Sequence, residues 1–353
     1  MGRTSRKVLL IAIGLGLLGA LLYRLRKSIP FSGFSGALLL ASLRQARLSL
    51  LLLSLAAIYA CFAIRALRWM RLARRLGAAN FGNIYRMTLA GFSAMFLLGR
   101  AGEPVRPLLL ARKEKLPIAD TFGVYVLERL LDTASAVVIA AIGLVVFTST
   151  HPAGESAGAL EKAARTTGGI LFAGVLAAIG LLVYFRLHGT LVLERRLEKW
   201  HHVHGWRGHG ARMILGFARG VQTIRTWGDL GETLAYSGVH WALVAMVYYW
   251  TAQSFGGSLA AISFGGTLLV LAFALVGSAV QLPGVGGGSQ VATFLAYTAI
   301  FGVEKERAAG AAIVVWLISF ASVSLAGVPL LVHEGWSLGE LRRVALKEEE
   351  ESA

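Results

Sequence analysis

The sequence predicts an all-α integral membrane protein, a polytopic bundle of about six full spans plus two re-entrant or broken helical pairs. Hydrophobic residues make up 56% of its 353 residues and charged residues only 15%, against roughly 25% charged in soluble domains. Apolar runs of about 20 residues, the length that crosses a hydrocarbon core, recur along the chain. The net charge of +16 comes from Lys and Arg clustered between these runs, where they meet anionic lipid headgroups. No nucleic-acid-binding motif accompanies the charge, so we expect no nucleic-acid partner.

The full spans follow from apolar runs that are long enough to cross a membrane. The first has basic residues on both sides and no small-residue cleavage site, so we expect it to be retained rather than removed as a signal peptide. The second ends in arginines on one helical face, Arg65 to Arg75, which we expect at the cytoplasmic surface. The six spans are expected at about 8–23, 48–64, 118–147 and 168–185, around the aromatic residues Trp241 to Trp250, and at 308–332.

Two apolar stretches are broken by glycine. Residues 87–98 are too few to span and end at Gly99-Arg100-Ala101-Gly102, while residues 262–280 end at Pro283-Gly284-Val285-Gly286 before a short helix at 290–301. The similarity of the two breaks indicates a weak internal repeat. Inserted in opposite senses, the two units form an inverted repeat, in which interrupted helices mark the binding site of many transporters. The alternative is that these are routine glycine and proline kinks.

The distribution of Lys and Arg predicts the sidedness. It places loops 65–86 and 186–235 and the C-terminus in the cytoplasm, and loops near 150–165 and 255–261 outside. The break at Gly99 then enters from the cytoplasm and the break at Pro283 from outside. The five Lys and Arg of residues 24–47 oppose this scheme.

One membrane domain is expected over residues 1–340. It includes an amphipathic basic segment, 187–230, on the cytoplasmic leaflet, and an acidic disordered tail follows at 341–353.

Charged residues follow the first break. Glu103 and Arg106 are three residues apart, and Glu128 and Asp132 share one face of the next helix with Arg129 beside them. Only 15 apolar or small residues run from Thr133 to Phe147, so a full span draws these charges about a turn into the hydrocarbon. Each unpaired charge there costs on the order of 3 kcal/mol, so partners or water are required.

Two interpretations of these charges remain open. Either they are interfacial and pair with arginines of neighbouring loops, or they line a polar cleft in which Arg100, Arg106 and Arg129 hold a lipid phosphate. In the second interpretation, N–H groups after Gly102 favour anions and the second break lines the opposite wall. The predicted substrate-binding residues are Arg100, Gly102, Glu103, Arg106, Glu128, Arg129, Asp132, Pro283, Gly284, Gly286, Gly287 and Gln290. With Cys61 as the single cysteine, we expect no intrachain disulfide and no cysteine framework for a metal. No other motif in the sequence indicates a metal site or a cofactor, so we expect neither.

These motifs resemble the lysylphosphatidylglycerol synthase transmembrane family, also called the flippase-like domain. The resemblance rests on Gly99 to Glu103, Arg106, Leu127 to Asp132 and Leu282 to Gly286, and it covers nearly the whole chain. It implies a bundle of about eight hydrophobic segments that moves lipids between leaflets. Larger members carry a synthase or glycosyltransferase domain, and we expect a stand-alone member here. Relatives often have Glu and Arg where this chain has Gln290 and Trp316, so its second half is less charged.

The expected function is a lipid translocase of the inner cell membrane, a multi-pass protein that is not an enzyme. Its expected substrate is an anionic phospholipid or a polyprenyl-phosphate-linked lipid, moved passively or by an ion gradient. The alternative is a membrane-embedded lipid-modifying enzyme, or a subunit that presents lipid to a partner lipid-synthesis enzyme. A nucleophile or metal site in the cleft favours the enzyme, and the sequence alone shows neither.

Overall fold

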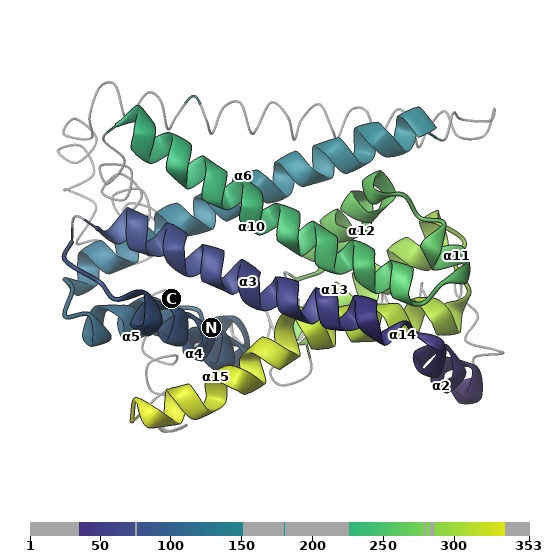
Figure 1. The fold of residues 1–353 in the computed structure, drawn as a ribbon, viewed down its shortest axis with the longest axis horizontal. Helices are drawn as coiled ribbons and strands as arrows, with labels where there is room; N and C mark the ends of the chain where they lie inside the picture. Colours follow the sequence, from purple (N-terminus) through teal and green to yellow (C-terminus); the bar gives the residue numbers. More distant parts are fainter. Residues whose placement is uncertain are drawn as a thin grey trace, which may run out of the picture.

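A computed structural model describes residues 35–74, 76–150, 180, 226–278, 280–282 and 286–335. Within these ranges the chain forms helices joined by short turns, with one pair of two-residue strands (Figure 1). The predicted all-α architecture is therefore confirmed for this part of the chain. The predicted spans at 8–23 and 168–185, nearly all of segment 187–230 and the tail at 341–353 lie outside it.

Four long helical segments form the frame of the bundle: α3 (Leu48–Ala73), α6 (Ile118–Thr150), α10 (Trp227–Ser254), and the continuous run of α14 (Lys305–Trp316), η3 (Leu317–Ala321) and α15 (Ser322–His333). At 1.5 Å per residue, each is long enough to cross a core of about 30 Å. Three helices in the described part are also apolar enough to do so: Leu48–Ala73, Asp120–Phe147 and Lys305–His333. Helix α10 is of similar length but carries Asp229 and Glu232 near its start.

Polar caps explain where several helices begin. The Thr226 hydroxyl accepts a hydrogen bond from the Asp229 N–H at 3.0 Å, and the Asp229 carboxylate accepts the Thr226 N–H at 3.1 Å. This reciprocal capping box starts α10. Single caps start two others: the Asn80 side chain accepts the Asn83 N–H before α4 (Phe81–Leu98), and the Ser263 hydroxyl accepts the Gly266 N–H before α12 (Phe264–Gly277).

The first break reverses the chain. Helix α4 ends at Gly99, whose φ of 65° favours glycine, and the 3₁₀ turn η1 (Gly99–Gly102) leads into α5 (Val105–Lys113). The Glu114 carboxylate after α5 accepts the Asn80 N–H before α4 at 2.7 Å. The α4–α5 pair therefore enters and leaves at the same end of the molecule.

The second break reverses the chain from the opposite end. After α12, strands β1 (Gln281–Leu282) and β2 (Gly286–Gly287) pair antiparallel, and α13 (Gly288–Leu295) leads into the π-helical turn η2 (Ala296–Ile300). Gly287 has a φ of 120°, and a Cβ on Gly277 or Gly288 would collide with the carbonyl oxygen of the other. Helices α12 and α13 thus lie close together where they leave the break.

Contacts at the two ends of the bundle define these directions. At one end Arg74 pairs with Asp229, and Lys113 pairs with Glu334 at 2.6 Å. At the other, the Arg47 N–H donates to the Ser254 carbonyl at 2.9 Å, close to helices α2 (Gly36–Gln45) and α11 (Gly257–Ala260) (Figure 1). The re-entrant pairs therefore insert from opposite ends, as predicted, and η1 contacts β1 between them.

Small residues bring the helices into close contact, as is common in membrane bundles. A Cβ on Gly327 of α15 would collide with the Leu89 carbonyl of α4, and one on Gly143 of α6 would lie 2.7 Å from the Leu269 amide nitrogen of α12. Hydroxyls add to the first contact, since the Ser93 hydroxyl donates to the Ser324 carbonyl. At these glycines, the backbones of the re-entrant pairs therefore lie in direct contact with the frame helices.

The sidedness of the bundle can be tested with two exposed alanines at opposite ends, Ala78 between α3 and α4 and Ala261 after α11. In a Cys61→Ala background, a membrane-impermeant maleimide should label Ala261→Cys in intact spheroplasts. It should label Ala78→Cys only in inside-out vesicles. Labelling of both positions from one side would contradict the scheme.

Candidate functional site

A buried carboxylate on α6, Glu128, organises the site. Its side chain is fully buried and accepts hydrogen bonds at one oxygen from Arg65 Nε at 2.9 Å and Arg68 Nη2 at 3.1 Å. The Nη1 atom of Arg106 lies 2.9 Å from the other oxygen, an ion-pair contact outside hydrogen-bond geometry. One carboxylate therefore joins helices α3, α5 and α6.

Asp132 lies one turn further along α6 and extends this contact. It accepts hydrogen bonds from Arg68 Nη2 at 2.8 Å, from Arg65 Nη2, and from Arg129 Nη2 at 3.0 Å. Arg68 also donates to the Ser237 hydroxyl of α10 at 2.9 Å. The buried ion-pair network comprises Arg65, Arg68, Arg106, Glu128, Arg129 and Asp132.

The predicted surface position of the α3 arginines is wrong for two of them. Arg65 is 7% exposed and Arg68 fully buried, whereas Arg71 and Arg74 are exposed. Of the two interpretations left open by the sequence, the one in which the α6 carboxylates pair with arginines of neighbouring loops is also wrong, because two of their main partners come from α3. An ionised carboxylate in hydrocarbon needs close guanidinium partners. Arg65 and Arg68, three residues apart on one face of α3, supply them to Glu128 and Asp132, four residues apart on α6.

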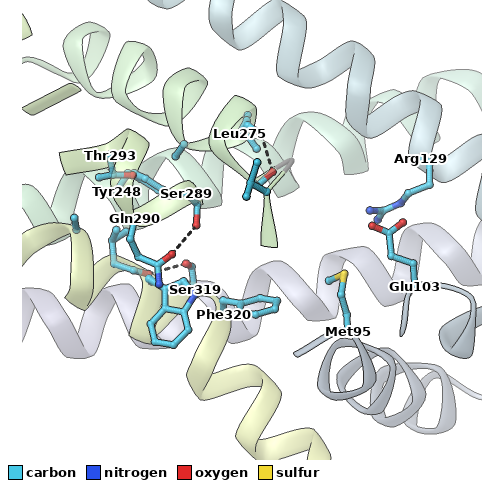
Figure 2. A pocket seen from close by; sticks show the side chains of 16 residues that line it. Met95, Glu103, Arg129, Tyr248, Leu275, Ser289, Gln290, Thr293, Ser319 and Phe320 are labelled. Carbon is cyan, nitrogen blue, oxygen red and sulfur yellow. Dashed lines mark hydrogen bonds between the residues drawn. The ribbon is translucent and has the colours of Figure 1, made fainter. Parts of the chain in front are cut away.

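The first break contributes Glu103, in the turn before α5. Its carboxylate accepts the Tyr125 phenol at 3.0 Å, and the Glu103 and Arg129 side chains point toward each other (Figure 2). The Arg129 side chain is 34% exposed, and its guanidinium lies 5.4 Å from the Tyr125 ring centroid. Arg129 is thus a member of the network whose side chain is partly accessible to solvent.

A small cavity of about 260 Å³ lies between the two breaks. Glu103 and Arg129 line one side, while Ser289 and Gln290 of α13 line the other (Figure 2). The Gln290 side-chain oxygen accepts the Gly287 N–H at 2.6 Å, which fixes the start of α13. The two breaks, distant in sequence, therefore share one polar cavity.

A large cavity of about 570 Å³ adjoins the small one. Both are lined by Glu103, Arg129, Tyr248, Leu275, Ser278 and Ser319. The large cavity reaches Arg65 and Asp132 at its polar end, and its other walls include Val137 of α6, Val244 of α10 and Leu271 of α12. The combined space has a charged end and an apolar end.

A family model described as the lysylphosphatidylglycerol synthase TM region matches residues 9–327. The chain belongs to this family. No curated protein and no solved structure matches it. Family membership makes it a membrane protein that associates with membrane lipids and has a lipid-related function.

The predicted site residues lie in different parts of the structure. Glu103, Arg129 and Gln290 line the small cavity, and Asp132 lines the large one. Glu128 and Arg106 line neither of these two cavities and belong to the ion-pair network. Among the predicted glycines, Gly102 is buried against the Ala94 carbonyl, and Gly286 and Gly287 form β2. The Arg100 side chain, Pro283 and Gly284 lie outside the described residues.

Sequence reasoning missed the contact between Cys61 and His240. The Cys61 sulfur lies 3.0 Å from His240 Nδ1, both side chains are buried, and both line the large cavity. Nothing in the sequence relates two residues 179 positions apart. Arg65 and Arg68 carried a weak signal, since they continue a helical stripe of buried residues through Cys61 and Leu72. Within the described residues, no group of three or more His, Cys, Asp or Glu side chains is placed to hold a metal ion.

Replacing Glu128 by Gln should destabilise the fold strongly. The change keeps the side-chain volume but leaves three buried guanidinium groups without this carboxylate, and losing one member of a buried ion pair costs about 3–5 kcal/mol. We expect a large loss of thermal stability in detergent. Glu232→Gln is the matched control, because Glu232 is exposed and 3.7 Å from exposed Arg71, and such pairs contribute about 0–1 kcal/mol. Equal stability of the two variants would contradict this role.

Proposed function

We propose that this protein moves a phosphate-bearing lipid between the leaflets of the inner membrane, as a multi-pass transporter rather than an enzyme. The observation that supports this most strongly is that the two cavities adjoin and share six lining residues, Glu103 and Arg129 among them. Beside the charged space between the helix breaks lies a larger space whose walls on α6, α10 and α12 include apolar side chains. A polar space beside an apolar one matches the polarity of a lipid headgroup joined to the first part of its acyl chains.

Arg129 is the proposed phosphate ligand. It uses one nitrogen to bind Asp132, and its Nε makes no hydrogen bond with any described residue. A guanidinium has five donors in a planar fork that matches phosphate oxygens. The four arginines of the network, Arg129 included, exceed the carboxylates of Glu103, Glu128 and Asp132 by one positive charge. That excess favours an anionic headgroup.

The apolar wall of the large cavity is proposed to guide the acyl chains. Its α6 and α12 helices expose large apolar side chains, among them Ile142 at 47% and Val276 at 77%. Such side chains are stable against lipid tails and unfavourable in water. The lipid's chains can therefore stay in the bilayer while its headgroup occupies the polar cavity.

The two re-entrant pairs supply the proposed route across the membrane. They enter from opposite ends and meet at the small cavity, so a headgroup held there lies between the two ends of the bundle. In transporters built this way, access alternates around a central site. The π-helical turn η3 contributes Ser319 and Phe320 to the same cavity, and π turns often mark functional positions.

A reconstituted assay tests the transport proposal. In proteoliposomes carrying phosphatidylglycerol with a fluorescent acyl chain, the wild type should speed the access of dithionite to inner-leaflet label. Arg129→Gln should slow this movement about tenfold or more, since charge-assisted hydrogen bonds contribute about 1.5–3 kcal/mol. The exposed Arg71→Gln variant is the charge-matched control. A folded Arg129→Gln protein that moves lipid at the wild-type rate would refute this assignment.

A second function, a lipid-modifying enzyme, is favoured by the contact between Cys61 and His240. In such an enzyme the thiol attacks a lipid ester carbonyl, His240 takes the proton and returns it to the leaving alcohol, and a thioester and a lyso-lipid result. Mass spectrometry of lipids recovered from the same proteoliposomes separates the two functions. Transport leaves phosphatidylglycerol intact. A lyso-lipid that disappears in Cys61→Ala would favour the enzyme.

A further inference from the structure

Glu103 is the carboxylate in the described lining of the small cavity, and it differs from the two carboxylates of α6. It lies in the turn before α5, is partly exposed and lines both cavities. Glu128, by contrast, is fully buried against Arg65 and Arg68. Asp132 accepts hydrogen bonds from three arginines. The α6 carboxylates are therefore stabilised as anions by the network, whereas Glu103 faces open space.

The lipid phosphate proposed at Arg129 would compete with Glu103 for the same cation. Arg129 is the cation in the described lining of the small cavity, and the Glu103 and Arg129 side chains point toward each other (Figure 2). A bound phosphate therefore places a second anion beside one guanidinium. Two anions in one small space repel each other, and a neighbouring negative charge favours the neutral, protonated form of a carboxyl group. A proton on Glu103 removes this repulsion.

The other arginines of the network do not take the place of Arg129 in the small cavity. Arg68 and Arg106 line neither of the two cavities, and Arg65 lines the large one, where it binds Glu128 and Asp132. The titratable and charged side chains that face Glu103 or share a cavity lining with it are Tyr125, Arg129 and Asp132 on α6, Cys61 and Arg65 on α3, and His240 and Tyr248 on α10.

His240 is a poorer proton acceptor than Glu103 in this setting. It is buried, its Nδ1 atom lies 3.0 Å from the Cys61 sulfur, and it lines the large cavity. A proton on its ring would add a second cation to a lining that already contains Arg65, which is unfavourable. Glu103 becomes neutral when it takes up a proton, so it adds no charge to either cavity.

Water in the small cavity can bring the proton to Glu103. The Thr293 hydroxyl lines this cavity, is 1% exposed and makes no hydrogen bond with any described residue. Buried polar groups are nearly always satisfied, by ordered water where the protein has no partner for them. At about 30 Å³ per water molecule, the cavity of about 260 Å³ has room for several. The Thr293 hydroxyl therefore indicates water in the space that Glu103 lines.

Tyr125 keeps Glu103 in place in both protonation states. Its phenol donates a hydrogen bond to Glu103 Oε2 at 3.0 Å, and its ring centroid lies 5.4 Å from the Arg129 guanidinium. Glu103 Oε1 is outside this hydrogen bond, so a proton on Oε1 leaves it intact. The carboxyl group can therefore gain and lose a proton beside Arg129 without moving away.

We propose that Glu103 takes up a proton when a lipid phosphate binds Arg129, so that this protein couples lipid movement to a proton gradient. The proposal rests on the transport function above and names its driving force. The proton comes from water in the cavity, forms an O–H bond at Glu103 Oε1, and returns to water when the phosphate leaves Arg129. One phosphodiester anion and one proton cross together, so the transport step carries no net charge.

Two gradients applied to proteoliposomes test the coupling. The measured quantity is the steady-state ratio of inner-leaflet to outer-leaflet phosphatidylglycerol with a fluorescent acyl chain, read with dithionite and corrected with protein-free vesicles. A pH difference of about one unit should enrich the lipid about tenfold in the leaflet that faces the higher pH, because one proton moves with each lipid. A potassium diffusion potential should leave the ratio unchanged.

Movement of the lipid anion alone gives the opposite pattern. The ratio then ignores the pH difference and shifts about fiftyfold for a potential of about 100 mV. That result for the wild type would overturn proton coupling while leaving transport in place.

Glu103→Gln tests whether Glu103 carries the proton. Gln has nearly the same size and cannot take up a proton, so the variant should lose its response to the pH difference and respond to the potential instead. The matched control is Glu232→Gln, because Glu232 is exposed and lines neither of the two cavities. The control should keep the wild-type pattern. A Glu103→Gln protein that keeps the tenfold pH response would refute the assignment to Glu103.

Proton uptake on binding decides the proposal separately if the wild type or Glu103→Gln moves no lipid. Short-chain phosphatidylglycerol is added to the purified full chain in weakly buffered detergent, and the pH change and the bound lipid are measured. The wild type should take up about one proton per bound lipid, as linkage between the two ligands requires. Glu103→Gln, with its folding checked by thermal stability, should take up none. Binding without proton uptake by the wild type, equal uptake by both proteins, or no binding at all would overturn the proposal.

Discussion

The cost of placing charge in hydrocarbon is the constraint on which the rest of this structure depends. Glu128 and Asp132 lie inside the bundle, and they remain compatible with the membrane because Arg65 and Arg68 of α3 bind both of them. Ion pairing of this kind fixes the rotation and height of α3 against α6 as well as satisfying charge. Through Arg106 it also fixes α5, and through Ser237 it reaches α10. The hydrophobic effect contributes little to the association of helices within a membrane. Polar contacts and close glycine packing therefore determine how these helices are arranged.

This rigid network and the two helix breaks have complementary roles. The network holds α3, α5 and α6 together through ion pairs, and Arg129 is the member that also lines both cavities. The breaks supply what the network lacks, namely open space, backbone turns built on glycine, and uncharged polar side chains from α13 and η3. A lipid phosphate can then bind at the edge of a fixed charged cluster without the cluster itself having to rearrange. We infer that stability and substrate binding are separated between Glu128 and Arg129, although these residues are neighbours in sequence.

Much of the fold could be predicted from the sequence, because hydropathy and glycine position are local signals. The long helices around residues 48–64, 118–147 and 308–332 and the breaks after Leu98 and before Gly288 follow from them directly. The site could be predicted only in part. Glu103 was identifiable as a charge beside the first break and Arg129 as a charge near the start of the next span, whereas the inward position of Arg65 and Arg68 contradicts the usual placement of a basic helix end. Pairwise contacts such as Cys61 with His240, or Arg129 beside the second break, depend on how distant helices pack and leave no local pattern.

The proposed function depends on a polar, water-accessible cavity that the two breaks enclose within the membrane domain. Ser289→Cys in a Cys61→Ala background tests it most directly, because Ser289 lines the small cavity on the second break. The measurement is the labelling rate of this cysteine with a charged, membrane-impermeant thiol reagent, with and without added phosphatidylglycerol. We expect the cysteine to react and the lipid to slow its reaction. A cysteine that stays unreactive while Ala261→Cys labels fully, or one whose labelling the lipid leaves unchanged, would contradict it.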